Sequence, residues 1–512
     1  MTITRVAARS AACVLLVAVT ACGAPVGESG SRDTLRVGFV TSNPTSLDPA
    51  KGTAGSDHTI LWSIYDSLIR FDKDVNPEPS LAKSWKWVSP THLRLDLVKG
   101  NKFQDGTAFD AEAVKFNLDR VRRGGKGITI ASDLAAVKDV KVSGPLTVDI
   151  TTSRPAASLL LTLSDRAGMM VSPAALRKNE AAVERHPVGA GAFTFTKWTP
   201  GDRIELRKAG TYWDAKSTKL DGISYRLMPD TQTRLNALQA GDIDFTYNVD
   251  PESFKGVEND ARLAHESSLT LAYYQLFLNL GKKPFDDIRV RRAVAMAIDR
   301  EALVKAVLGD GGGEAAWMPV PSAHWAYTPS LKGKPAYDPA AAKRLLAQAG
   351  HAHGLSFDVA FETGSLNERR AEIIKSSLAK VGITVNLRPN DTATTTAAFI
   401  ESQSVQALNN RWTGRPDPAT TYFAEFSENG FTNVGHFVDK DLDAALRAGE
   451  SGRDQAARVA AYAKANKILI DVGFNIPLYF ERDTAVFSKG VKGYQPTLLG
   501  KPRFDGVSLS GN

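Results

Sequence analysis

Apolar and polar residues alternate along several short stretches of the chain. Residues 35–40 and 355–361 show this period of two, which places one row of strand side chains against a core. We therefore expect β-strands there. Strands of the same kind are expected at residues 93–97, 383–387 and 405–408.

Other stretches carry the spacing of an amphipathic helix. Val114, Leu118 and Val121 fall on one helical face after Asp110, a residue type that favours helix N-termini. Apolar residues at similar spacing, with capping residues or Gly at the ends, predict further helices. These are expected over residues 60–68, 284–309, 338–350 and 368–380.

The order of these elements indicates the fold class. The expected helix 368–380 separates the expected strands 355–361 and 383–387. Strand, helix and strand in so short a stretch favour a βαβ unit with parallel pairing. Because strands and helices are mixed along the whole chain, the sequence predicts an α/β protein.

The first residues resemble a lipoprotein export signal. Two arginines precede an apolar run over residues 11–21, which is too short for a permanent membrane span. Val19-Thr20-Ala21-Cys22 resembles the lipobox of bacterial lipoproteins, in which the chain is cut before the Cys and the Cys is acylated. The resemblance implies a signal peptide over residues 1–21, then a lipidated Cys22 and a flexible tether over residues 22–32. The alternative is an ordinary secretory signal with a chance Cys.

The Cys content and the charge of the chain argue against a disulfide and against a nucleic-acid partner. Loss of Cys13 with the signal leaves Cys22 as the last Cys, so no intramolecular disulfide can form. The net charge of +7 falls to about +5 without the signal. The longest basic runs, residues 120–123 and 289–292, are too sparse for a nucleic-acid surface, and no nucleic-acid partner is expected.

Seven short segments have distinctive residue patterns. Residues 47–49 read Leu-Asp-Pro, and residues 187–193 read Pro-Val-Gly-Ala-Gly-Ala-Phe. The segments are 46–50, 79–85, 99–107, 187–193, 212–214, 238–244 and 284–300. Together they resemble the family 5 extracytoplasmic solute-binding proteins of bacterial ABC importers, which include oligopeptide-, dipeptide- and nickel-binding proteins. The chain departs from that family at Gln104, where His is usual, and at Ala190 and Ala192, where Thr and Pro are usual.

The resemblance implies a two-lobed periplasmic-binding-protein-like fold with an extra domain inserted in the first lobe. Tyr273 to Leu280 and Asn475 to Phe480 would be strands that cross between the lobes near the hinge. Gly189 and Gly191 are expected to serve a tight loop between lobes. The expected divisions are residues 33–65, 185–268 and 481–512 for lobe 1, 66–184 for the inserted domain and 269–480 for lobe 2.

The loop after residue 408 is the strongest candidate for ligand contact. Trp412, Arg415 and Asp417 place an apolar wall, a forked cation and an acceptor on a loop stiffened by Pro. In peptide-binding members of the family, a Trp-containing loop here carries an Asp that pairs with the peptide's amino group. This loop is one residue shorter and has Arg415 after Trp-Thr-Gly, which would favour a carboxylate or another anion. The alternatives are an Arg415 ion pair, a Trp412 in the core and an Asp417 that serves the turn.

Two further places contribute candidates for ligand contact. Ser42 and Asn43 follow the first expected strand, and loops after strands at the open edge of an α/β sheet commonly bind ligands. Tyr274 and Gln275 lie beside the expected hinge. The sequence shows no recognisable metal-ligand cluster, cofactor-binding loop or catalytic motif, so no metal, cofactor or enzymatic role is expected.

The sequence therefore predicts a lipid-anchored, extracytoplasmic binding protein. It would capture a small polar ligand between its lobes and deliver it to the permease subunits of an ABC importer, acting as a monomer in the periplasm or at the outer face of the cytoplasmic membrane. Short peptides are the leading ligand class because they dominate the family; carbohydrates, opines or glycoconjugates, and metal chelates stay open. A secreted hydrolase on a similar scaffold and an envelope sensor without transport are the alternatives from other classes.

Overall fold

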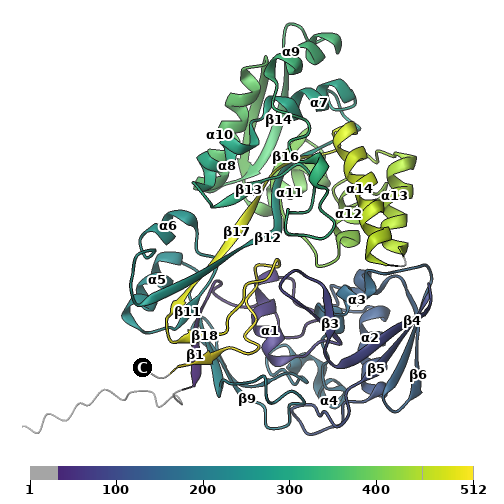
Figure 1. Ribbon diagram of the computed structural model, residues 1–512, viewed down its shortest axis with the longest axis vertical. Helices are drawn as coiled ribbons and strands as arrows, with labels where there is room; N and C mark the ends of the chain where they lie inside the picture. Colours follow the sequence, from purple (N-terminus) through teal and green to yellow (C-terminus); the bar gives the residue numbers. More distant parts are fainter. Residues whose placement is uncertain (1–32, 453, 511–512) are drawn as a thin grey trace, which may run out of the picture.

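The computed structural model describes residues 33–452 and 454–510, which form two lobes stacked along the long axis of the molecule (Figure 1). The strands β12 (Leu263–Leu278) and β17 (Ile476–Ser488) run from one lobe into the other. Cys22 and the expected signal and tether lie outside the described residues. Within the described ranges, no helix is both long and apolar enough to cross a membrane.

The lower lobe in Figure 1 combines a mixed sheet with a separate antiparallel sheet. Besides the crossing strands, the mixed sheet in this lobe contains β1 (Thr34–Phe39), β8 (Phe193–Thr199), β9 (Arg203–Lys208), β10 (Gly222–Leu227) and β11 (Phe245–Thr246). A separate short pair near the C-terminus is formed by β18 (Val491–Lys492) and β19 (Ser508–Leu509). The helices beside them are α1 (His58–Ile64), α5 (Thr231–Ala240) and α6 (Pro251–Lys255).

The separate sheet has four strands in the order β4-β5-β7-β6, formed by β4 (Ala82–Ser89), β5 (His92–Leu97), β7 (Thr147–Thr152) and β6 (Val137–Gly144). The helix α2 (Ala111–Arg123) packs on it. The remaining elements of this part are β2 (Ile69–Phe71), β3 (Pro77–Pro79), α3 (Leu159–Thr162) and α4 (Pro173–Val183). All of them lie inside the stretch 66–184, whose limits as an inserted domain stay a prediction.

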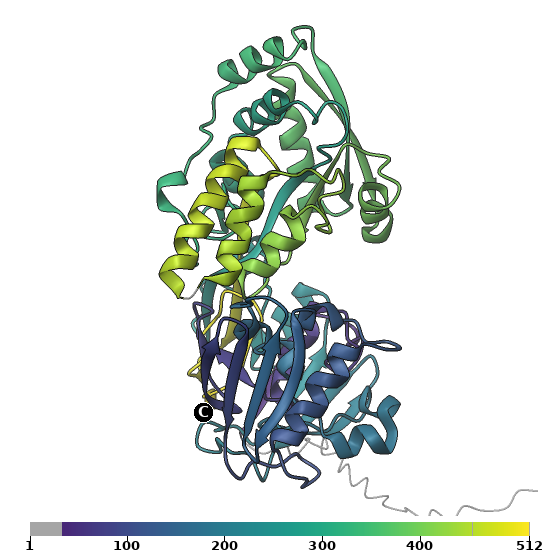
Figure 2. The same ribbon diagram turned by 90° about the vertical axis from the view of Figure 1, so that its right-hand side faces the viewer.

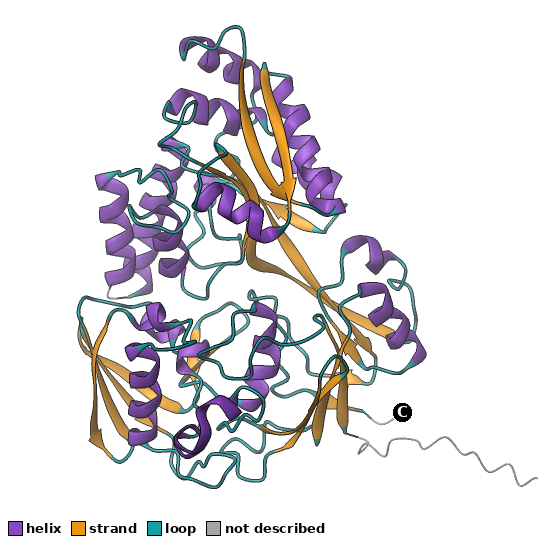
Figure 3. Cartoon of the chain, turned by 180° about the vertical axis from the view of Figure 1, so that it is seen from behind, coloured by secondary structure: helices purple, strands orange, loops and turns teal. Residues whose placement is uncertain are grey.

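The upper lobe is an α/β unit in which helices cover the strands (Figure 3). Its strands are β13 (Gly313–Ala315), β14 (Leu355–Glu362), β15 (Ile383–Asn390) and β16 (Ala407–Trp412). Its helices are α7 (Ile288–Ala297), α8 (Arg300–Leu308), α9 (Pro339–Gln348), α10 (Ser365–Ala379), α11 (Thr392–Ile400), α12 (Pro418–Phe426), α13 (Lys440–Ser451) and α14 (Gln455–Val472).

One hydrogen-bonded sheet joins the lobes. Its strand order is β15-β14-β16-β12-β17-β11-β1-β10-β9-β8, with β13 added on β17. The strands β14 and β15 pair in parallel, as the expected βαβ unit requires, and β1 pairs in parallel with both β10 and β11. Since β12 pairs with β16 on one side and β17 on the other, the two crossing strands form the connection between lobes.

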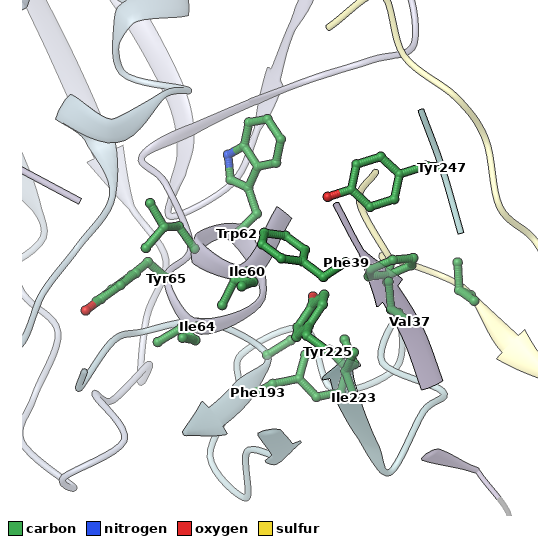
Figure 4. Packing of buried hydrophobic residues seen from close by; sticks show 14 of the residues in the cluster. Val37, Phe39, Ile60, Trp62, Ile64, Tyr65, Phe193, Ile223, Tyr225 and Tyr247 are labelled. Carbon is green, nitrogen blue, oxygen red and sulfur yellow. The ribbon is translucent and has the colours of Figure 1, made fainter. Parts of the chain in front are cut away.

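Each lobe has its own apolar core. In the lower lobe, the alternation predicted for β1 places Val37 and Phe39 in the core, where the Phe39 ring contacts those of Tyr225 and Tyr247 at centroid distances of 5.9 and 6.4 Å (Figure 4). Burial of one such aromatic side chain contributes about 1.5–3 kcal/mol to folding. A second cluster fills the upper lobe, and a third lies under the four-stranded sheet.

Two predicted helices differ from the structure. The helix expected through residue 68 ends at Ile64, because the chain turns into extended backbone at Tyr65 on its way to β2. The helix expected over residues 284–309 is two helices. The backbone is extended at Ile298 and Asp299, and the Asp299 side chain accepts a hydrogen bond from the Ala302 N–H at 3.0 Å, which caps the second helix.

Candidate functional site

A cavity of about 950 Å³ lies between the lobes, beside the crossing strands. Its lower wall comes from the loop after β1 and the start of α1, from residues 129–136 and 154–166, and from residues 499–501. Its upper wall comes from residues 411–424 and 429–431. A cavity of this size between two lobes has the volume and place typical of a small-ligand site. We call it the interlobe cleft.

Basic side chains are the most distinctive feature of the interlobe cleft. Arg415 is exposed to the cleft and has no hydrogen-bond or ion-pair partner among the described residues. Arg166 is only 6% exposed and donates hydrogen bonds to the carbonyl groups of Gly52 and Ala54, which carry no net charge. The basic lining residues are Arg154, Arg166, Arg411, Arg415 and Lys501.

Two of these cations are already paired with acids. Arg154 contacts Glu450 at 3.3 Å, and Arg411 contacts Glu481 at 3.4 Å. Arg166, Arg415 and Lys501 thus supply the positive charge that is left for a ligand. The field they create in a partly dehydrated cleft favours a carboxylate or another anion.

Two carboxylates lie near this positive charge. Asp165 accepts hydrogen bonds from His58 at 2.5 Å and from the Arg166 N–H at 2.7 Å. Burial raises its pKa, but His58, Lys501 and these hydrogen bonds lower it more, so the pKa of Asp165 lies well below its usual range. Asp165 is therefore an ionised partner that positions neighbouring groups.

Asp133 is the carboxylate that remains open to the cleft. Its side chain is accessible to solvent and has no side-chain partner in the described part of the chain. Desolvation by the cleft walls and repulsion by Asp165 raise the pKa of Asp133 to about 6, against the opposing effect of Arg415 and Arg166. Near neutral pH it is an acceptor suited to an amino group.

Lys501 has a lowered pKa and titrates in mildly alkaline solution. Burial, together with the nearby Arg415 and Arg166, lowers the pKa of Lys501 to about 8, although Asp165 acts in the opposite direction. The charge that Lys501 offers to a ligand is thus present at neutral pH and is lost in moderately alkaline solution.

The predicted loop residues lie at different depths. Arg415 lines the interlobe cleft. It forms no ion pair with a described residue, so the structure does not support the alternative of an Arg415 ion pair. Asp417 lies in the cleft wall but is 2% exposed, caps α12 and forms an ion pair with Arg458 at 2.6 Å. Trp412 does not line the cleft; its side chain is half-buried, and its indole N–H donates to the Thr421 hydroxyl at 3.1 Å.

The other predicted residues lie outside the cleft lining. Gln275 is fully buried and donates a hydrogen bond to the Glu425 carboxyl group at 2.7 Å. The Tyr274 ring packs under the Arg370 guanidinium, 3.7 Å from the ring centroid. Ser42 and Asn43 are exposed in the loop after β1, and the Asn43 side chain accepts a hydrogen bond from the Gly201 N–H at 3.0 Å.

The sequence interpretation missed most of the charged cleft residues. Asp133, Arg154 and Arg166 lie in the stretch 129–166 and Lys501 lies far away along the chain, and none stands in a recognisable motif. The signal that could have found them is topological: Lys501 lies on the C-terminal return to the first lobe. Their convergence depends on how that return and the stretch 129–166 pack.

Comparison with known proteins agrees with this architecture. The chain is 32% identical over 476 residues to the glutathione-binding protein GsiB of Pectobacterium atrosepticum, covering 89% of this chain and 90% of that protein. It is similar to the structure of the periplasmic binding protein DppA from Helicobacter pylori in complex with the peptide STSA, with a TM-score of 0.77, 25% identity and coverage of 93% and 97% of the two chains. The substrate-binding protein CtaP from Listeria monocytogenes gives a TM-score of 0.83 at 21% identity, with coverage of 93% and 99%, which shows the shared two-lobed fold.

The family assignment follows from the sequence match. Residues 76–433, more than half of the chain, match the family described as bacterial extracellular solute-binding proteins, family 5 Middle. This agrees with the motif resemblance, with the two-lobed fold and with the interlobe cleft. The chain belongs to the family 5 bacterial extracellular solute-binding proteins.

Proposed function

We propose that the protein captures a short, carboxylate-bearing peptide in its interlobe cleft and delivers it to an ABC importer. The observation that carries this proposal is the positive charge of Arg166, Arg415 and Lys501 in the same cleft as the exposed carboxylate of Asp133. A peptide with more carboxylates than amino groups matches this pattern of charge. The relative named as a glutathione-binding protein and the peptide complex of DppA support the same ligand class.

In this proposal each free group of the cleft has one partner on the ligand. Arg415 and Lys501 bind carboxylates, Asp133 accepts from the amino group, and Arg166 holds the lower wall in place through its two carbonyl partners. Asp417 contributes by fixing the loop that carries Arg415. Asn43, Tyr274, Gln275 and Trp412 would act through the surrounding structure, which is the role their present contacts support. Ser42 is exposed in the loop after β1 and has no part in the proposed set of ligand contacts.

The mechanism is a shift between open and closed arrangements of the lobes. Lobe 1 (residues 33–65, 185–268 and 481–512), which carries the inserted domain (residues 66–184), moves relative to lobe 2 (residues 269–480) about the crossing strands. A ligand that contacts both walls favours the closed arrangement by its difference in affinity for the two states. The proposal includes no chemical step on the ligand.

The decisive experiment identifies the ligand directly. Residues 23–512 are produced without the signal, the purified protein is denatured, and the small molecules it releases are identified by mass spectrometry, followed by calorimetric titration of emptied protein with reduced glutathione. Release of short peptides or of glutathione, with binding on titration, is the expected result. Release of a neutral sugar, together with no heat from glutathione, would overturn the proposed ligand class.

Binding should depend on pH in a way that Lys501 sets. A bound carboxylate stabilises the charged amine, so the Lys501 contribution is full below its free-protein pKa of about 8 and is lost as the pH rises through the higher pKa of the complex. We expect the affinity for glutathione to fall several-fold to about tenfold between about pH 7 and about pH 9.5, measured by calorimetry. Lys501→Arg keeps its charge over this range and serves as the matched control. An equal loss in that variant would assign the pH effect to another group.

The proposed membrane attachment depends on Cys22. Replacing Cys22 by Ser removes the thiol that would carry the lipid, and the described residues contain no helix that could span a membrane. We therefore expect nearly all of the Cys22→Ser protein in the soluble fraction after cell fractionation, where the unchanged protein sediments with membranes. Retention of the variant in the membrane fraction would contradict a lipid anchor at this position.

A further inference from the structure

A second cavity, of about 720 Å³, lies between the lobes beyond the rim of the interlobe cleft. One wall belongs to the four-stranded sheet and the segment that follows it, with Trp87, Val88 and Leu160. The opposite wall belongs to the upper lobe, with Trp325, the end of α13 and the start of α14. Figure 2 shows these two helices directly above the four-stranded sheet. We call this space the outer cavity.

A polar bridge between the lobes lies where the two cavities adjoin. The Glu450 carboxylate pairs with Arg154 at 3.3 Å, and the Glu450 carbonyl accepts a hydrogen bond from the Ala157 N–H at 3.0 Å. Arg154 and Glu450 line the interlobe cleft, whereas Ala157 and the residues that follow Glu450 line the outer cavity. The two walls of the outer cavity therefore come together in the same arrangement of the lobes that forms this bridge.

The lining of the outer cavity fits a neutral, apolar molecule. Its charged side chains among the described residues are already occupied, since Asp417 pairs with Arg458 at 2.6 Å and Asp454 caps α14. The Arg458 guanidinium also lies 5.0 Å from the centroid of a Trp325 ring. The lining also has two tryptophans and three prolines, and the flat indole rings favour packing against another aromatic ring.

Val88 contributes an exposed apolar side chain to the lining of the outer cavity. It is 50% exposed and lines the outer cavity together with two tryptophans, so a ligand here would remove apolar surface from water. A volume of about 720 Å³ is within the range of cavities that hold a molecule of several fused or linked rings. No counter-charge is needed for such a ligand.

We propose that the outer cavity is a second binding site, for a neutral aromatic small molecule, whose occupation stabilises the closed arrangement of the lobes. Because the two walls belong to different lobes, the molecule binds the closed arrangement more tightly than the open one. The ligand of the interlobe cleft favours the same arrangement. Thermodynamic linkage then requires each ligand to increase the affinity for the other by the same factor.

The test uses N-phenyl-1-naphthylamine, a neutral aromatic dye whose fluorescence rises in apolar surroundings. We expect saturable binding to the unchanged protein, and at least about tenfold weaker binding to Val88→Asp, because the new carboxylate would be desolvated beside the dye. Val438→Asp is the matched control, since Val438 is 51% exposed and lies at the other end of α13. Equal dye affinity in the two variants, or no binding to the unchanged protein, would overturn the proposal.

Saturation with glutathione tests the coupling between the sites. We expect tighter dye binding in its presence, by about 3- to 10-fold, the size of an ordinary coupling between two sites. Displacement of the dye by glutathione would place it in the interlobe cleft and overturn the proposal. If glutathione does not bind at all, the ligand class in the proposed function is wrong. The comparison of Val88→Asp with Val438→Asp still decides whether the outer cavity is a binding site.

Discussion

Replacing Arg415 by Ala should weaken glutathione binding by about 10- to 100-fold, which corresponds to about 1.5–3 kcal/mol for one lost hydrogen-bonded charge pair. Arg415 is the exposed guanidinium of the cleft with no partner among the described residues, so its hydrogen-bonding capacity is available to the ligand. Calorimetric titration of the variant and the unchanged protein measures the difference. Stability should change by less than about 0.5 kcal/mol, because Arg415 is exposed and forms no hydrogen bond or ion pair with the described residues.

Arg123→Ala is the matched control for this prediction. Arg123 also carries an exposed guanidinium, with 74% of its side chain accessible, but it lies on α2 and contacts Asp119 outside the interlobe cleft. Its replacement removes the same charge from the protein, so a difference between the variants isolates the position of the charge. Equal affinities in the two variants would remove Arg415 from the ligand site.

The elements of the fold could largely be predicted from local patterns. The alternation over residues 355–361 and 383–387 and the helical spacing between them correspond to β14, α10 and β15, because each of these elements buries one face in its own lobe. The break at Asp299 was missed, since a capping Asp in a run of helix-forming residues also fits an exposed position on one continuous helix.

The candidate site could be predicted only in part. The loop after β16 was identified from its unusual composition. Which side chains point into the cleft depends on how they alternate along the end of the strand, and composition does not determine this. Arg411 and Thr413 line the interlobe cleft, so the intervening Trp412 points away from it. Lys501 and Asp133 reach the cleft through tertiary packing, about which periodicity carries no information.

The shared motifs of the family have a structural explanation in this chain. Gln104, in place of the usual His, donates hydrogen bonds to the carbonyl groups of Ile64 and Phe193 and accepts one from the Gly189 N–H. The Tyr65 hydroxyl donates to the carbonyl of Leu47 at 2.8 Å. Three motifs that are distant in sequence thus meet at the end of α1, and the glycines expected in a loop between lobes serve this junction instead.

Replacing Gly189 by Ala should destabilise the protein by about 3 kcal/mol or more, at the upper end of the usual cost of overpacking. A Cβ atom here would lie 2.2 Å from the Ile64 carbonyl oxygen and 2.6 Å from the Tyr65 ring. That oxygen cannot move away without losing its hydrogen bonds to Gln104 and to the Gly191 N–H, both at 2.9 Å. Reversible urea unfolding, followed by tryptophan fluorescence, measures the free energy of unfolding.

Gly210→Ala separates this steric effect from the general cost of replacing a glycine. A Cβ atom at Gly210 would have no heavy atom within 4 Å, and its backbone does not adopt the left-handed conformation, so the change in stability should stay within about 0.5 kcal/mol. A similarly small effect at Gly189 would mean that the backbone at the end of α1 can shift enough to accommodate the added Cβ atom. The expected large difference would show that Gly189 permits a close contact between backbones, which positions α1 and the lower wall of the interlobe cleft.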